Sequence, residues 1–130
     1  MTFISQEDIN RLAIGKIIWL ATVNSKNVSH LTPIWYTYHS EEIYICTSES
    51  SQNFPNIKTN TIVSFALEDG INPLCGIGKA MTLFVSEHPN LDVIEEFKKS
   101  YDWDITTDKE CTVLINIELK KLLMRLKLKA

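Results

Sequence analysis

Short apolar runs separated by turn residues are the feature that most restricts how this chain can fold. The runs are rich in β-branched and aromatic residues, as β-strands are. Turn sequences such as "NSKN" and "SEE" join successive runs directly, which favours antiparallel pairing, because parallel strands need long crossovers. The pattern predicts a mainly β protein, an antiparallel barrel or sandwich with a few short helices as covers. The six runs are "KIIWLATV", "VSHLTPIWYTYHS", "IYICT", "TIVSFALEDG", "LCGIGKAMTLFVS" and "CTVLINIELKKLLMRLKLKA".

Several positions refine this strand pattern. Pro33 cannot donate to a strand ladder, so its strand is expected at a sheet edge or at a bulge. Gly76 and Gly78 share one face, where a neighbouring backbone or a flat ligand could come close; a bend at a barrel corner is the alternative. The first run (16–23) is apolar almost throughout, as a strand covered on both faces would be. The last run (111–130) alternates with period two and predicts a long strand with one wet face.

Two helices have clear sequence signals. Ser5 is followed by two acidic residues, which predicts a capped helix that ends near Gly15. After Pro89, the segment "NLDVIEEFKKSYD" predicts an amphipathic helix. Its expected apolar side consists of Leu91, Ile94, Phe97 and Tyr101.

Length and composition limit the class of protein. A chain of 130 residues fits one domain (1–130) with a single core. Its apolar fraction of 45% and charged fraction of 22% are those of an ordinary globular protein. The net charge of −3 argues against general nucleic-acid binding, although residues 118–130 hold five of the thirteen basic side chains. No run has the form of a signal peptide or a membrane span, so a cytoplasmic protein without a membrane partner is expected.

The cysteines do not follow a known framework. Cys46, Cys75 and Cys111 are widely separated and lie in apolar, strand-like surroundings. This setting predicts buried free thiols rather than a disulfide or metal framework. No other group of residues has the spacing of metal ligands either.

A cluster of hydroxyl groups lies between the third run and the helix that follows it. Hydroxyls and free backbone N–H groups at a helix start form a ready anion site. Lys58 is the one cation of this stretch (44–60). The two common glycine-rich nucleotide loops are absent, and the three histidines share no catalytic motif. The residues alone therefore suggest a small ligand with a phosphate, and they identify no catalytic group. The hydroxyl residues are Thr47, Ser48, Ser50 and Ser51.

Five short motifs then follow one another in a fixed order: Leu20-Ala21-Thr22-Val23, Thr32-Pro33-Ile34-Trp35-Tyr36, the strand into Thr47-Ser48, Asn56-Ile57-Lys58-Thr59-Asn60 and Gly78-Lys79-Ala80. In order and spacing, over about residues 10–126, this set resembles the pyridoxamine 5′-phosphate oxidase-like (PNPOx-like) family of FMN-binding split barrels. The resemblance implies a six-stranded antiparallel split barrel that forms a homodimer, with two flavin sites in the grooves between subunits. A barrel with apolar runs on both faces would also need a buried, symmetric interface.

The resemblance also implies which residues hold the cofactor. A strand is expected to lie along the flavin ring, largely through the backbone of Thr32, Pro33, Ile34 and Trp35. Trp35 and Trp103 could each stack on the ring, although core packing is the commoner role of a tryptophan. The hydroxyl turn and its neighbours are expected to hold the ribityl phosphate, through Thr47, Ser48, Ser51, Gln52, Asn53, Lys58 and Lys79.

Two departures from the family pattern bear on function. Flavin-binding members usually carry an Arg-Lys pair where this chain has Gln52-Asn53. The loss of two charge-assisted contacts is expected to lower FMN affinity by about a hundredfold or more. Lys58 and Lys79 are the candidates to compensate, and His30 stands where the oxidases often have a basic residue. The chain also ends in "LKLKA", without the Arg-x-His segment of the vitamin B6 oxidases, which argues against pyridoxamine-phosphate oxidation.

Three functional hypotheses follow from these observations. The first is a homodimeric FMN-binding protein that acts as a flavin-dependent oxidoreductase on an unidentified substrate, with a deazaflavin or haem as neighbouring cofactors. The second is a split-barrel dimer that binds cofactor weakly or not at all and serves as a stress-related binding or scaffold protein. The third gives the basic face of residues 120–129 a nucleic acid or an acidic partner, although lysines on an exposed strand more often prevent edge-to-edge aggregation.

Overall fold

The structure is a computed structural model that describes residues 4–67, 74–87 and 90–124. The two helices predicted from the sequence, after Ser5 and after Pro89, are present as α1 and α3. Most of the other elements are strands. In chain order the elements are α1 Gln6–Ile14, β1 Ile17–Val23, β2 Ser29–Trp35, β3 Thr37–His39, β4 Glu42–Thr47, α2 Asn53–Thr59, β5 Ile62–Leu67, β6 Cys75–Phe84, the short helix η1 Val85–Glu87, α3 Leu91–Tyr101 and β7 Val113–Met124.

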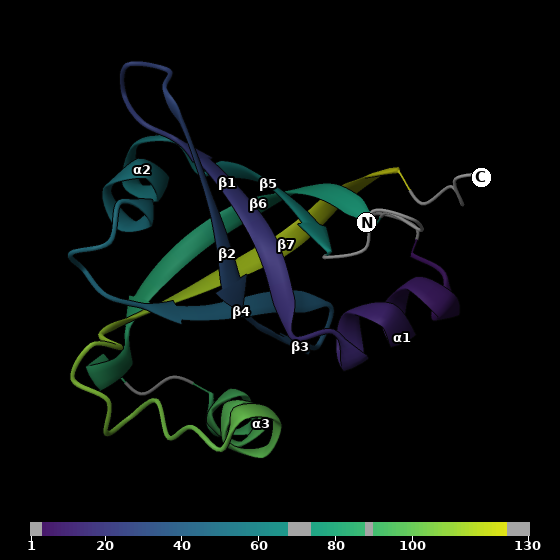
Figure 1. Cartoon of the computed structure of the whole chain (residues 1–130), viewed down its shortest axis with the longest axis vertical. Coiled ribbons are helices and arrows are strands. Elements are labelled where there is room, and N and C mark those ends of the chain that lie inside the picture. Colours follow the sequence, from purple (N-terminus) through teal and green to yellow (C-terminus); the bar gives the residue numbers. More distant parts are fainter. Residues whose placement is uncertain (1–3, 68–73, 88–89, 125–130) are drawn as a thin grey trace.

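One antiparallel sheet contains all seven of these strands, in the order β2-β1-β5-β6-β7-β4-β3. The sheet curls into a half-barrel, so that β2 and β4, which are not neighbours in this order, come into contact (Figure 1). The predicted mainly β, antiparallel architecture is confirmed. The predicted count of six strands is wrong, because the described chain has seven.

The additional strand arises because the second apolar run breaks at Tyr36, between β2 and β3. The Tyr36 N–H donates to the carbonyl of Lys16 at 3.2 Å and to the Tyr101 hydroxyl at 3.1 Å. That hydroxyl donates to the Lys16 carbonyl at 2.7 Å and also contacts the carbonyl of Tyr36. These bonds take up the backbone of Tyr36, so the ladder with β1 ends and the chain crosses to the other end of the sheet.

The main core fills the inside of the curled sheet. Ile18 and Leu20 of β1 are fully buried there, and so are Val113, Ile115 and Ile117 of β7. The alternation predicted for the last strand is therefore confirmed from Ile115 to Lys120, whereas Leu114, on the face predicted to be wet, is buried against α3. The expected burial of both faces of β1 is not seen in the single chain. Its outward face carries Trp19, which is 38% exposed.

Pro33 lies on an edge strand, and Gly78 lies where a neighbouring strand comes too close for a side chain. β2 pairs only with β1, so Pro33 lies on an edge strand as predicted. β6 is irregular against β7 between Ile77 and Gly78. A Cβ atom at Gly78 would overlap the side chain of Ile117 and crowd the carbonyl of Glu118. A neighbouring strand, and not a ligand, therefore uses the space at this glycine.

Helix α3 forms a second, smaller core against the sheet. Asn90 caps it, because the Asn90 side chain accepts a hydrogen bond from the backbone N–H of Asp92 at 2.8 Å. The predicted apolar side is partly wrong: Leu91 in the first turn is 77% exposed, while Val93 is fully buried. Leu91 begins the helix outside the small core, which Val93 and Phe97 enter. The small core contains Cys46, Val93, Phe97, Ile105, Cys111 and Leu114.

Cys46 and Cys111 form a disulfide, which corrects the prediction of free thiols. Their Cα atoms are 5.6 Å apart although 65 residues separate them in the sequence. The pairing of β4 with β7 brings the two together, and sequence spacing gives no sign of that pairing. Cys75 is a free thiol and is half-buried.

Within the described residues, no helix is both long and apolar enough to cross a membrane. The predicted basic face of residues 120–129 falls mostly outside the described residues. Of that face, Lys120 pairs with Glu118 on the same strand.

Candidate functional site

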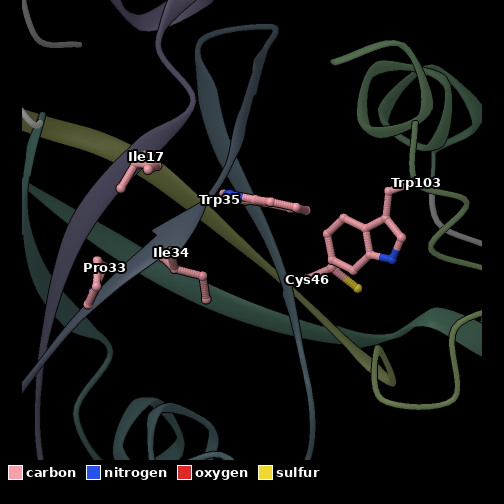
Figure 2. A pocket seen from close by; sticks show the side chains of 6 residues that line it. All are labelled: Ile17, Pro33, Ile34, Trp35, Cys46 and Trp103. Atoms are coloured by element: carbon pink, nitrogen blue, oxygen red, sulfur yellow. The ribbon is translucent and has the colours of Figure 1, made fainter. Parts of the chain in front are cut away.

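A pocket of about 380 Å³ opens where β2 faces β4 and the segment after α3 covers the gap (Figure 2). Three of the residues along its wall, Pro33, Ile34 and Trp35, belong to the strand expected along a flavin ring. The lining consists of apolar side chains and one disulfide-bonded cysteine. These residues are Ile17, Pro33, Ile34, Trp35, Cys46 and Trp103.

Aromatic rings form one wall of this pocket. Trp35 stacks on Tyr101, with ring centroids 4.6 Å apart and planes at 12°. Trp103 meets Trp35 edge to face at 5.8 Å, and Phe97 supports Trp103 from the core at 5.4 Å. The indole N–H of Trp103 donates to Asp108 at 2.8 Å, which fixes the orientation of the ring. Since Trp35 is 47% exposed, this wall offers aromatic surface to a flat ligand.

The predicted hydroxyl turn begins directly after Cys46, at the end of the pocket formed by β4. Ser48 organises it: its carbonyl accepts from the Ser51 N–H at 3.0 Å, and its hydroxyl lies 2.8 Å from that of Ser50. The Ser51 hydroxyl is buried and has no hydrogen-bond partner in the described part of the chain. Buried hydroxyls are rarely left so, and a ligand oxygen or a water usually satisfies them.

The pair that replaces Arg-Lys takes part in a network of neutral side chains. Gln52 donates to the side-chain oxygen of Asn56 at 2.7 Å, and Asn56 donates to the hydroxyl of Thr22 at 3.0 Å. Thr22 in turn donates to the side-chain oxygen of Asn53 at 3.0 Å. Thr22, Asn53 and Asn56 are all buried. The side chains of Gln52 and Asn53 are thus engaged in joining α2 to β1.

The two predicted phosphate cations also have other contacts. The Lys58 ammonium lies 5.1 Å from the centre of the Phe54 ring, in a cation–π arrangement. Lys79 is exposed on β6, in register with Glu118 of β7. The contact with Lys120, and to a smaller extent the attraction of Lys79, lower the pKa of Glu118. Within the described residues, neither lysine contacts the hydroxyl turn.

The titratable groups beside the pocket are tyrosines with high pKa values. Burial raises the pKa of Tyr101 to about 12 and raises that of Tyr36 still further. Both phenols are therefore neutral near pH 7 and donate hydrogen bonds: Tyr36 to the Leu12 carbonyl of α1, and Tyr101 of α3 to the Lys16 carbonyl just before β1. His30 has its Nε2 atom 2.7 Å from the Thr32 hydroxyl, next to the pocket strand. Among the described residues, no group of three or more His, Cys, Asp or Glu could hold a metal ion.

The two parts of the predicted site, the strand Thr32–Trp35 and the hydroxyl turn, lie close together in the fold. Pro33, Ile34 and Trp35 line the pocket, and the hydroxyl turn begins at its edge. Ile17 and Cys46 also line it and were missed, because nothing local in the sequence distinguishes them from core residues. Trp103, considered only as one of two stacking candidates, lies at the pocket as well.

No family model and no curated protein matches this sequence. Solved structures do match it in fold. An F420 reductase is 17% identical, with a TM-score of 0.75 over 92% of this chain and 98% of its own. The heme storage protein HutZ from Vibrio cholerae is 16% identical, with a TM-score of 0.74 over 92% and 94%. A Listeria innocua protein that carries the name of pyridoxamine 5′-phosphate oxidase is 15% identical, with a TM-score of 0.70 over 90% and 94%. At these identities the likeness shows a shared fold.

Proposed function

Because the chain has the split-barrel fold of PNPOx-like proteins, we propose that it binds a flavin, with FMN as the first candidate. The observation that carries this proposal is the position of the pocket. Its lining includes Pro33–Trp35 and Trp103, and Cys46 of the lining directly precedes the hydroxyl turn, where the Ser51 hydroxyl is buried and has no partner among the described residues. A flavin has the same division, a flat apolar ring at one end and a polar tail at the other.

In this proposal the ring occupies the aromatic end of the pocket. The backbone and side chains of Thr32, Pro33, Ile34 and Trp35 position it, and Trp103 closes the opposite side. A bound flavin supplies the redox chemistry, while the protein supplies position and electrostatics. The pocket lining contains no ionisable side chain, since Cys46 is disulfide-bonded, so it offers neither an acid nor a base.

The tail occupies the hydroxyl turn in the same proposal. Thr47, Ser48 and Ser51 donate to it directly. Gln52 and Asn53 contribute only if they leave their bonds to Asn56 and Thr22, and Lys58 only if it leaves Phe54. Lys79 is the remaining cation of the prediction. We therefore expect FMN affinity well below that of a site with an Arg-Lys pair.

The proposal includes a homodimer. The strands β1, β2, β5 and β6 share an outward face whose apolar side chains are exposed in the single chain. A contiguous apolar face of this kind marks an interaction surface. Pro33 and Trp35 lie on the same face of β2, so a second copy would reach the mouth of the pocket. The exposed residues are Trp19, Leu31, Ile62, Met81 and Leu83.

An absorbance spectrum of the purified protein, followed by titration with FMN, tests the proposal. Flavin bands in the protein as purified, or quenching of FMN fluorescence on titration, are the expected results. Ser51→Ala should weaken FMN binding about threefold to tenfold, since one hydrogen bond contributes about 1 kcal/mol. Ser25→Ala, an exposed serine in the β1–β2 turn, is the matched control and should not change it. Equal affinities for the two variants would contradict the assigned tail site.

A cofactor-free dimer is the second candidate, and the Gln52–Asn56–Thr22–Asn53 network favours it. This network engages the Gln52, Asn53 and Asn56 side chains, on the helix α2 side of the site, with groups of the chain itself. Protein that is colourless and does not quench FMN would support this candidate. The likeness to an F420 reductase makes a deazaflavin the next ligand to titrate before that conclusion is drawn. The substrate and the oxidoreductase activity are then the next questions.

A further inference from the structure

The Cys46–Cys111 disulfide lies between two hollows of the molecule. Cys46 lines the aromatic pocket, while Cys111 lines a second hollow of about 370 Å³ beside Glu49, Phe84 and Thr112. The cysteines are only 6% and 4% exposed. Each cysteine thus borders a hollow, and these two hollows are where a small thiol would approach the buried bond.

This disulfide joins the two parts of the candidate site. On one side, Cys46 immediately precedes Thr47 and the hydroxyl turn. On the other side, Cys111 lies near the C-terminal end of the segment 102–112, which carries the pocket residue Trp103. Within that segment Asp108 links the two, because its carbonyl accepts from the Cys111 N–H at 3.1 Å and its carboxylate from the Trp103 indole at 2.8 Å. The disulfide therefore links the aromatic wall to the turn by way of Asp108, Cys111 and Cys46.

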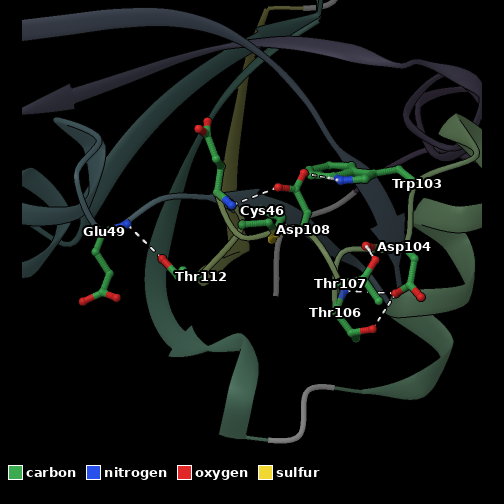
Figure 3. The surroundings of a disulfide bond; sticks show 10 residues. Cys46, Glu49, Trp103, Asp104, Thr106, Thr107, Asp108 and Thr112 are labelled. Carbon is green, nitrogen blue, oxygen red and sulfur yellow. Dashed lines mark hydrogen bonds between the residues drawn. A yellow bond between two sulfur atoms is a disulfide. The ribbon is translucent and has the colours of Figure 1, made fainter.

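Few other bonds cross the same junction. The Thr112 N–H donates to the Thr47 carbonyl at 3.0 Å, and the Glu49 N–H donates to the Thr112 hydroxyl at 3.1 Å. Within the segment, Thr106 and Thr107 donate to Asp104 (Figure 3), and the Glu110 N–H donates to the Asp108 carboxylate. Outside this junction, the Val85 N–H of η1 donates to the Thr112 carbonyl at 2.9 Å. The small core packs Phe97 and Val93 of α3 together with Ile105 and the two cysteines, and these apolar contacts do not require the S–S bond. Breaking the disulfide should therefore loosen the segment without unfolding the protein.

We propose that the Cys46–Cys111 disulfide is a redox switch that controls the aromatic pocket. In the oxidised state it holds Trp103 against Trp35 and keeps the hydroxyl turn beside the pocket. A dithiol reductant breaks the S–S bond, supplies two electrons and two protons, and leaves two cysteine thiols while it becomes a disulfide itself. In the reduced state the segment 102–112 moves among several positions, and the pocket is complete in only a fraction of the molecules.

This regulation rests on the proposed ligand site, and its size follows from the competent fraction. The apparent dissociation constant rises by the inverse of the fraction of molecules with a complete pocket. If reduction leaves about one molecule in five competent, FMN binding weakens about fivefold.

The first measurement is a count of thiols in the denatured protein. The protein as purified should give one reactive thiol, Cys75, and the reduced protein three. Trp emission is then compared in both states, in the wild-type protein and in Trp103→Phe. A change on reduction that is present in the wild-type protein and absent in Trp103→Phe is expected. Three thiols before reduction, or no change in emission, would overturn the switch.

The second measurement is FMN titration in both redox states. We expect about fivefold weaker binding after reduction, and no effect of reductant in the double variant Cys46→Ser/Cys111→Ser. Cys75→Ser keeps the disulfide and should behave like the wild-type protein. Equal affinity in both states of the wild-type protein would overturn the regulation. If FMN binds in neither state, the proposed function fails, and the Trp103 emission result alone decides on the switch.

Discussion

Thr22, Asn53 and Asn56 lie on two elements that are far apart in the sequence and are buried side by side in the fold. Their hydrogen bonds join one hydroxyl and two amides, and Gln52 extends the chain of bonds to the surface. Buried polar groups require partners, and neutral ones provide them without the cost of burying a charge. Gln52 and Asn53 therefore have a structural role that explains their presence. A phosphate ligand is not needed to account for them.

The raised pKa values of the tyrosines predict how stability changes at alkaline pH. Burial raises the pKa of Tyr101 to about 12, and it raises the pKa values of Tyr36, Tyr38 and Tyr44 as well. In the unfolded chain these phenols ionise near pH 10, so above that pH the unfolded state binds fewer protons than the native state. The free energy of unfolding should therefore fall as pH rises from about 10 towards about 12.

Denaturant titrations at a series of alkaline pH values measure this fall. Tyr101→Phe should be less stable near neutral pH, because the bonds to Lys16 and Tyr36 are lost. It should also lose less stability across the alkaline window, because one ionising group is gone. A wild-type stability that stays flat across that window would contradict the tyrosine assignment.

At the scale of elements, local patterns predicted what depends on local physics. The period-two alternation of Val113, Ile115 and Ile117 gave the buried face of β7, and the proline at position 33 gave an edge strand. The break at Tyr36 was not predictable, because its partner Tyr101 is 65 residues away. The disulfide was missed for the same reason.

The candidate site divides in the same way. The strand Thr32–Trp35 and the hydroxyl turn are recognisable as sequence motifs. Ile17 and Cys46 resemble ordinary core residues until β2 and β4 come together around the pocket. Non-local packing, which no short sequence window records, supplies the rest of the site.

The N-cap of helix α3 leads to a prediction about the free energy of unfolding. Asn90 is its N-cap, and its side chain accepts from the Asp92 N–H at 2.8 Å. Asn90→Ala should lower the free energy of unfolding by about 1 kcal/mol, because a helix-end donor loses its partner. Asn90→Ser keeps a capping oxygen and is the matched control. Urea denaturation measures both, and an Asn90→Ala variant as stable as the wild-type protein would show that the cap contributes nothing.

At the scale of the whole molecule, the exposed face of β1, β2, β5 and β6 connects association with ligand binding. Trp19 of β1 lies opposite Pro33 of β2 in the ladder, and Ile17 lies opposite Trp35. The apolar face therefore continues directly into the lining of the pocket. If a second copy covers this face, it also covers the pocket mouth. Ligand affinity and dimer formation should then change together.

Ile62 allows this coupling to be tested. It lies on β5 within the apolar face and is 55% exposed in the single chain. Ile62→Lys places a charge in the proposed interface, and burying an unpaired charge is costly. We expect a dimer for the wild-type protein in sedimentation experiments and a shift towards monomer for this variant. FMN binding should weaken in the same variant, since the second copy no longer covers the pocket mouth.

Ile14→Lys is the matched control, because Ile14 ends α1, is 79% exposed and lies outside this face. It should remain dimeric and bind FMN as the wild-type protein does. A wild-type monomer would refute the dimer proposal. A monomeric Ile62→Lys variant with unchanged FMN affinity would instead show that one chain completes the pocket alone, so that the apolar face serves association only.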